Sequence, residues 1–212
     1  DVERSRGLGD VYKRQIKGLE AQVQLIATPG TTSVRISGVE ESGSEGAYVV
    51  TKKDNIIEVT MNEYGSKKTW MNILPRAASQ VRKIEITGAS IPTEIHLKGG
   101  SVIAQKWGKD LKASLTSGKV ISTGGTATVQ AYVQKGEIGV IDHTGKVTAD
   151  SYAGTMGLRN IQGDVDASLF SGLLQMEKVR GFVSLSTQQA NSKINQGSGT
   201  VSYTHLTLPT KA

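Results

Sequence analysis

Apolar and polar residues alternate in short segments along much of the chain, which is the period-2 pattern of half-buried β-strands. Six such segments precede residue 99, namely AQVQLIA, SVRIS, YVVTK, NIIEVTM, RKIEIT and TEIHLK. Gly, Pro, Asn and Ser separate these segments, as turn residues do, and no window carries the apolar stripe of an amphipathic helix. The pattern predicts an all-β chain.

In the second half of the chain, apolar residues recur with a strict 18-residue period that no insertion interrupts. One repeat position holds Leu111, Val129, Val147, Val165 and Val183, a second holds Ala113, Ala131, Ala149 and Ala167, and a third holds Gly100, Gly118, Gly136, Gly154 and Gly172. A fixed period with two alternating segments is typical of a β-solenoid, in which each period forms one coil. We expect the glycine at the corner between the two segments, and inward side chains stacked about 4.8 Å apart.

The repeat divides the chain into regions. Its first members are Ile84 and Ile86, which share positions with Val102 and Ala104, so we place the β-solenoid at residues 84–200. Residues 16–83 lack the 18-residue pattern but keep the strand pattern. We expect them to form a small β-rich, antiparallel cap region at the N-terminal end of the solenoid.

The two ends of the chain differ from the rest. The segments SRGLGDVYKRQ and VSYTHLTLPT resemble conceptual translations of the adapters used in transposase-based sequencing libraries, each in the orientation expected at its end. We therefore predict that residues 1–15 and 201–212 are sequencing-adapter artefacts and exclude them from the fold. The remaining residues, 16–200, would then be a fragment of a longer protein.

Composition narrows the possible chemistry. The absence of Cys excludes a disulfide scaffold, a thiolate zinc site and a Cys nucleophile. The net charge is +6, but the two ends contain five Lys or Arg and three Asp or Glu, so residues 16–200 carry only +4. With no nucleic-acid or phosphate-loop motif, we expect no nucleic-acid partner and no cofactor. The two distant histidines of residues 16–200 and the absence of Cys give no zinc-ligand spacing, so we expect no metal. No apolar run reaches a membrane span, so membrane attachment would need flanking segments.

Four lines of the repeat carry a family resemblance. The segments DLKASLTSGKV, TVQAYVQKGEI, KVTADSYAGTM and DVDASLFSGLL are similar to those of a bacterial putative-adhesin family, formerly a domain of unknown function and related to surface head-domain proteins. The resemblance covers most of residues 20–199. It implies a single-stranded right-handed β-helix at a bacterial cell envelope or extracellular surface, and it transfers no functional residue.

Candidate catalytic groups are few. His143 follows Asp142, but no G-x-S-x-G motif is present, so we interpret His143 as structural or partly exposed and His96 as a surface residue. Asp150, Asp164 and Asp166 are expected to project outward, and they could form the acidic patch of a polysaccharide-active β-helix enzyme. The strict repeat leaves no room for the long loops that build a cleft, so we expect a non-catalytic protein.

The repeat register also predicts an aromatic surface. Tyr152 and Phe170 occupy the same outward position in successive coils, so their rings should stack, and Tyr132 and Phe182 should face outward on the same wall. Exposed aromatic side chains on a flat sheet are suited to contact sugars or proteins. The hypothesis is a binding domain of a surface protein that contacts a glycan or an envelope protein. Alternatives are the polysaccharide-active enzyme and an envelope stress-sensing, partner-binding domain.

The assignment of the two ends is tested directly on the source DNA. Reads that cross both junctions should lack the codons of Asp10–Gln15 and Val201–Thr210 and continue into other coding sequence. Contiguous genomic DNA that retains those codons would show that the two ends are protein.

Overall fold

The computed structural model describes residues 13–28, 30, 34–37, 48–53, 56–61, 82–195 and 200–205. These residues form strands, turns and bends. Within these ranges no helix is present, and so none that could cross a membrane.

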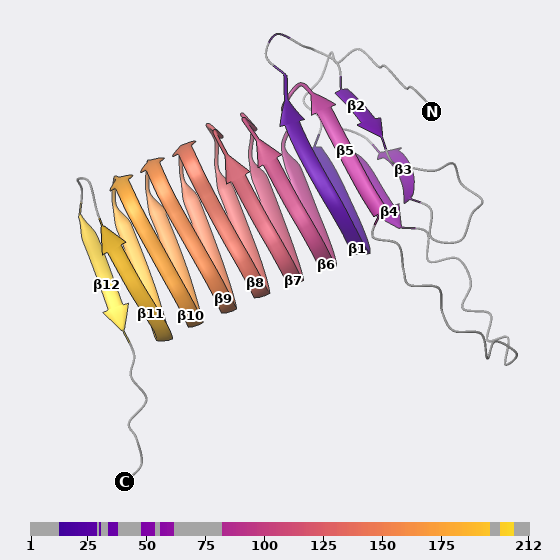
Figure 1. Ribbon diagram of the computed structural model, residues 1–212. Helices are drawn as coiled ribbons and strands as arrows, with labels where there is room; N and C mark the ends of the chain where they lie inside the picture. Colours follow the sequence, from indigo (N-terminus) through magenta and orange to yellow (C-terminus); the bar gives the residue numbers. More distant parts are fainter. Residues whose placement is uncertain are drawn as a thin grey trace, which may run out of the picture.

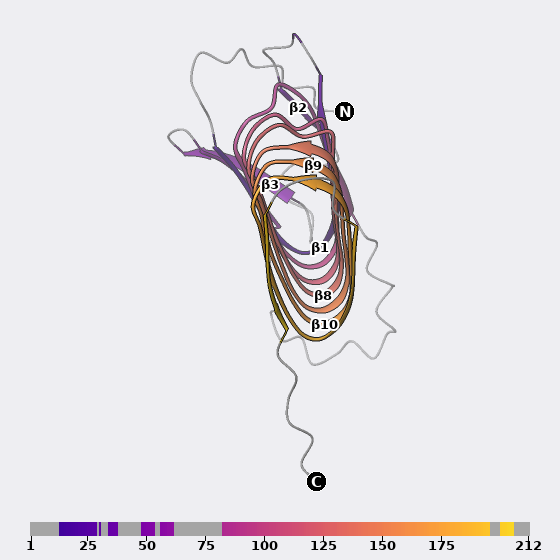
Figure 2. The same cartoon turned by 90° about the vertical axis from the view of Figure 1, so that its left-hand side faces the viewer.

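Six parallel strands form the body of the molecule, and each makes one turn of a β-solenoid (Figure 1). They are β6 (Thr93–Gln105), β7 (Leu111–Thr123), β8 (Val129–Thr144), β9 (Val147–Gln162), β10 (Val165–Arg180) and β11 (Val183–Asn195). Each strand pairs with the next at an offset of one sequence repeat, as Leu111 does with Val129. Viewed along the stack, the turns superpose as a flattened tube (Figure 2). The predicted 18-residue solenoid is confirmed.

The core is a set of stacked columns inside this tube. Leu111, Val129, Val147, Val165 and Val183 form one column and are at most 3% exposed. The alanines of the next repeat position, Ala113 to Ala167, are buried as well. An alanine column leaves space for only a methyl group from each turn, so the two walls approach closely there. Each added turn covers the apolar side chains of the turn before it, as the stacking of repeats requires.

Glycine forms the corner between the two walls of each turn. Gly100, Gly118, Gly136, Gly154 and Gly172 stack in register and have φ between 114° and 146°. A Cβ added at Gly136 would overlap the carbonyl oxygen of Gly118 in the preceding turn. The position therefore excludes other residues for two reasons, the backbone conformation and the approach of the neighbouring backbone.

The opposite corner uses a left-handed residue in turns β6 to β10. Lys106, Asp142, Asn160 and Lys178 have φ of 52–53°, and Gly124, at the same repeat position, has φ of 68°. Asn160 Nδ2 donates a hydrogen bond of 2.7 Å to Asp142 Oδ1, which links two successive turns at this corner. Asp, Asn and Gly tolerate this conformation best. The column lacks a common residue type, so the sequence pattern did not identify it.

The N-terminal end contains one strand out of chain order. Strand β1 (Lys13–Ala27) lies parallel between β6 on one side and β4 (Ile56–Met61) and β5 (Arg82–Gly88) on the other. Val23 pairs with both Ile84 and Val102. The repeat spacing alone would place Ile84 directly beside Val102, but β1 separates them. Ile84 and Ile86 still face the core, as their repeat positions predicted.

Antiparallel pairs complete this end. Strand β2 (Val34–Ser37) pairs with β5, and β3 (Tyr48–Lys53) pairs with β4. All six early strand segments expected from the sequence are strands in the structure. At the other end, β12 (Val201–His205) continues the parallel stack, with Val201 beside Val183.

The glycine corner gives a direct stability test. Gly136→Ala should lower the free energy of unfolding by at least about 2 kcal/mol, because the strained φ and the contact with Gly118 act together. The matched control is Gly157→Ala, since an added Cβ there meets nothing within 4 Å. Urea unfolding followed by circular dichroism measures both variants. Equal midpoints for the two would show that the corner does not require glycine.

Candidate functional site

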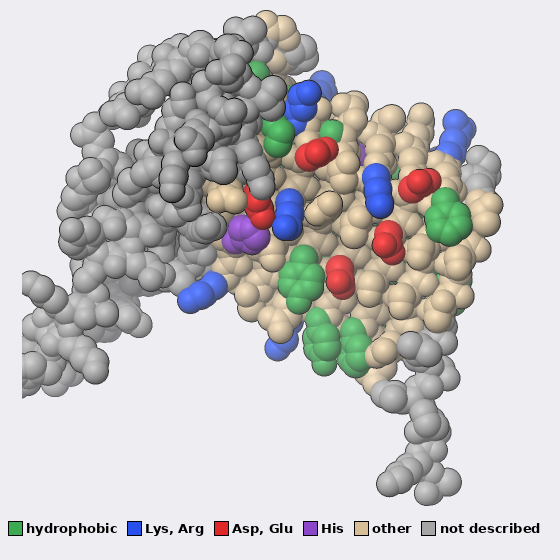
Figure 3. All heavy atoms as spheres, turned by 180° about the vertical axis from the view of Figure 1, so that it is seen from behind, with side chains coloured by type: hydrophobic (Ala, Val, Ile, Leu, Met, Phe, Trp, Pro, Cys, Tyr) green, Lys and Arg blue, Asp and Glu red, His purple; other side chains and the backbone are tan. Residues whose placement is uncertain are grey.

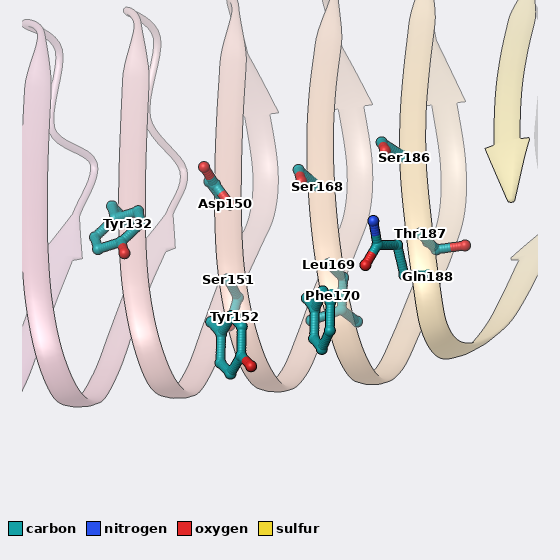
Figure 4. A pocket seen from close by; sticks show the side chains of 10 residues that line it. All are labelled: Tyr132, Asp150, Ser151, Tyr152, Ser168, Leu169, Phe170, Ser186, Thr187 and Gln188. Carbon is teal, nitrogen blue, oxygen red and sulfur yellow. The ribbon is translucent and has the colours of Figure 1, made fainter. Parts of the chain in front are cut away.

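A shallow groove of about 250 Å³ crosses four successive turns of the solenoid. Tyr132, Asp150, Ser168 and Ser186 form one line of side chains along it, at the same position of β8, β9, β10 and β11. Tyr152, Phe170 and Gln188 form the second line, closer to the glycine corner (Figure 4). Ser151, Leu169 and Thr187 lie between the two lines. The groove therefore runs along the solenoid axis rather than along a strand.

The aromatic pair in this groove stacks as predicted. The ring centroids of Tyr152 and Phe170 are 4.6 Å apart and the rings are inclined by 6°. Beside the pair, Ser171 Oγ donates a hydrogen bond of 3.3 Å to the carbonyl of Tyr152, which also joins the two turns. Tyr152 is 50% exposed and Tyr132 is 44% exposed, so both can contact a ligand. The stack holds each ring in a fixed orientation at the side of the groove.

Asp150 is the one charged residue among those that line the groove. Partial burial raises the pKa of its carboxyl group, and the nearby carboxylate of Asp166 raises this pKa further. A carboxyl group in this setting accepts hydrogen bonds from hydroxyl or amine groups and disfavours a nearby anion. Exposed hydrophobic side chains and carboxylates share one face of the molecule (Figure 3).

The three aspartates of the predicted acidic patch are engaged differently. Asp164 Oδ1 accepts a hydrogen bond of 3.1 Å from the backbone N–H of Phe182, so this carboxylate stabilises a turn. Asp110, which occupies the same repeat position in an earlier turn, accepts an equivalent hydrogen bond of 3.2 Å through Oδ1 from the backbone N–H of Thr128. The described residues contain no cluster of three or more potential metal ligands. The geometry brings Asp150 and Asp166 together and gives Asp164 a structural role.

Phe182 lies apart from the other aromatic residues. It is 50% exposed and precedes β11, at the repeat position of Asp164. Phe170 comes six positions later in the repeat, near the other end of the same wall. The structure therefore places Tyr132, Tyr152 and Phe170 around the groove and Phe182 outside it.

His143 is a core residue rather than a catalytic one. It is 1% exposed, pairs in register with Ile161, and its Nε2 donates a hydrogen bond of 2.7 Å to the carbonyl of Ala127. Within the described part of the chain, Nδ1 has no hydrogen-bond partner. Burial lowers the pKa of His143, and the bond to Ala127 opposes this effect only in part. The structural interpretation of His143 is confirmed.

A buried carboxylate on β6 was not predicted from the sequence. Glu94 is only 8% exposed, and its Oε1 accepts from His96 Nε2 at 2.9 Å and from Lys112 Nζ at 3.3 Å. Its Oε2 accepts from Gln15 Nε2 at 3.2 Å, which connects β1 to β6. The sequence feature that indicates this cluster is the opposite charge of Lys112, which follows Glu94 by one repeat. We assign this cluster a structural role at the junction of β1, β6 and β7.

Two solved structures are similar to this chain. A putative adhesin from Bacteroides fragilis has a TM-score of 0.50 and 18% identity, over 98% of this chain and 96% of that one. A putative cell adhesion protein from Clostridium sporogenes has a TM-score of 0.33 and 12% identity, over 96% and 98% of the two chains. No family model and no curated protein matches. The first similarity shows a shared fold, and the name of that protein agrees with the family resemblance of the repeat segments.

The buried His143 makes stability depend on pH. Unfolding restores its ordinary pKa of 6.5, so the unfolded chain binds a proton that the folded chain resists. Stability should therefore fall as the pH drops below about 6.5 and level off once the folded histidine is protonated. His143→Val, with a side chain like that of Val179 in the same column, should remove this part of the loss between pH 7 and 5. If the urea midpoints of the two proteins fall by the same amount between pH 7 and 5, the assignment is contradicted.

Proposed function

We propose that this chain is a non-catalytic binding domain of a bacterial surface or cell-envelope protein, and that it acts as an adhesin. The observation that carries the proposal is the stacked pair of Tyr152, which is half exposed, and Phe170, which is partly buried, beside a groove on a flat wall. Stacked rings present a rigid apolar surface at a low cost in conformational entropy, which favours them as contact residues.

The solenoid supports this proposal through its regularity. Turns β8 to β10 are paired on both edges, so their walls keep one geometry and repeat each outward position at a constant spacing. Such a surface offers several contacts at a regular spacing, and linked weak contacts raise the overall affinity beyond that of each one. The name of the similar Bacteroides fragilis protein supports a location at the cell surface.

The arrangement of the carboxylates favours binding over catalysis. A glycoside hydrolase of the usual kind needs two carboxyl groups that flank the scissile bond. Asp150 supplies the only carboxyl group among the residues that line the groove, so no second one lies across it, and Asp164 is held by the backbone of Phe182. The groove is also open and shallow, whereas acid–base chemistry profits from a site that excludes water.

Binding by the aromatic pair can be tested on the full chain. Immobilised mucin, purified peptidoglycan and a collagen-type matrix protein serve as the probes in a biosensor experiment. We expect the chain to bind at least one of them, and the double variant Tyr152→Ser/Phe170→Ser to weaken that binding at least about tenfold. The fold should survive, because neither ring belongs to the buried core.

The matched control is Phe182→Ser, which removes a ring as exposed as that of Tyr152 but outside the groove, and which should leave binding unchanged. Undiminished binding by the double variant would overturn the proposed contact surface. Release of reducing sugars from any polysaccharide probe would overturn the non-catalytic assignment. Binding to the matrix protein alone would identify a protein partner.

A further inference from the structure

The groove on β8–β11 has the dimensions and chemistry of a binding site for a repeating ligand. Its first line of side chains, Tyr132, Asp150, Ser168 and Ser186, takes one residue from each of four turns. Adjacent turns of a parallel stack are about 4.8 Å apart, so this line is about 15 Å long. A ligand lying along it meets polar groups at regular intervals close to the length of one sugar unit.

The backbone around the groove is not available to a ligand. Each of β8, β9 and β10 pairs with a neighbour on both sides over its length. An extended peptide therefore cannot add itself as a further strand here, which is the mode that gives such peptides their affinity. A ligand must therefore be recognised by side chains. Those that line the groove carry hydroxyl, carboxyl and amide groups beside aromatic rings.

This combination matches the chemistry of a pyranose. Sugars have apolar C–H faces that pack on aromatic rings and a rim of hydroxyl groups that donate and accept hydrogen bonds. Tyr132 and the stacked pair of Tyr152 and Phe170 supply the rings, from the two opposite lines of the groove (Figure 4). Ser168, Ser186 and Gln188 supply short polar groups next to them.

Charge narrows the ligand class further. Asp150 is the one charged residue in the groove, and Asp166 lies close enough to raise the pKa of its carboxyl group. No lining residue carries a positive charge. A polysaccharide bearing carboxylate or sulfate groups would meet only repulsion here, while neutral hydroxyl groups can donate to Asp150.

We propose that the groove binds an uncharged, unbranched polysaccharide that lies along the solenoid axis and spans three to four turns. Tyr132 and the exposed part of the Tyr152–Phe170 stack contact the sugar, and Asp150, Ser168 and Ser186 accept or donate hydrogen bonds along one edge. This inference rests on the proposed binding function and names its ligand and direction.

The test uses oligosaccharides of increasing length with the full chain. Calorimetric titration with β-1,4-linked glucose and N-acetylglucosamine oligomers of two to six units should show affinity that rises up to three or four units and then levels off. Oligogalacturonate of the same lengths should bind at least about tenfold more weakly. Affinity that does not depend on length, or tighter binding of the anionic series, would overturn the inference.

Substitutions in the groove locate the binding. Tyr132→Ser should weaken binding of the four-unit oligomer at least about fivefold, while Phe182→Ser should not change it. Asp150→Asn should retain the neutral oligomer, because an amide still hydrogen-bonds, and should improve binding of oligogalacturonate. Unchanged affinity of Tyr132→Ser for the four-unit oligomer, together with unchanged binding of oligogalacturonate by Asp150→Asn, would contradict the site.

The outcome also separates this inference from the proposed function. If no oligosaccharide binds but the aromatic double variant loses binding to the matrix protein, the domain binds a protein and the glycan inference fails alone. If the chain binds neither the oligosaccharides nor any surface probe, both proposals fail.

Discussion

The close approach of neighbouring backbones at the glycine corner is the constraint on which the rest of the molecule depends. At Gly118, Gly136 and Gly154 the carbonyl oxygen of one turn occupies the space that a Cβ of the next turn would need. Because the corners stack without a side chain between them, successive turns keep parallel pairing on both walls. That pairing holds the apolar columns in register and gives the outward positions their constant spacing.

The strand register that stacks the core side chains also stacks the outward side chains. Tyr152 meets Phe170 for the reason that Ala149 meets Ala167, since each pair is one turn apart at the same repeat position. The outer wall therefore consists of ladders whose composition can vary freely, provided that the inward positions stay apolar. The groove between the two ladders on β8–β11 results from this freedom, with small residues along one part and aromatic rings along another.

The sequence period was enough to predict the solenoid, its buried columns and the stacking of Tyr152 on Phe170, because these depend only on local spacing. The place of β1 could not be predicted in this way. Ile16 pairs with Ile95, and the separation of these two residues is not a whole number of repeats. Nor did spacing reveal the left-handed corner at Lys106, Asp142 and Asn160, whose shared feature is a backbone angle rather than a residue type. The groove escaped prediction because its shape depends on side-chain sizes across four turns.

The insertion of β1 has a consequence for how the chain folds. Turns β6 to β11 can form one after another, since each closes a loop of only one repeat on its neighbour. Strand β1 reaches β6 across 79 residues, and closing a loop of that length costs about 1.3 kcal/mol more in chain entropy. On a ribosome-bound chain β1 can pair in parallel with β4 and β5 first, but its contact with β6 has to wait until β6 has emerged.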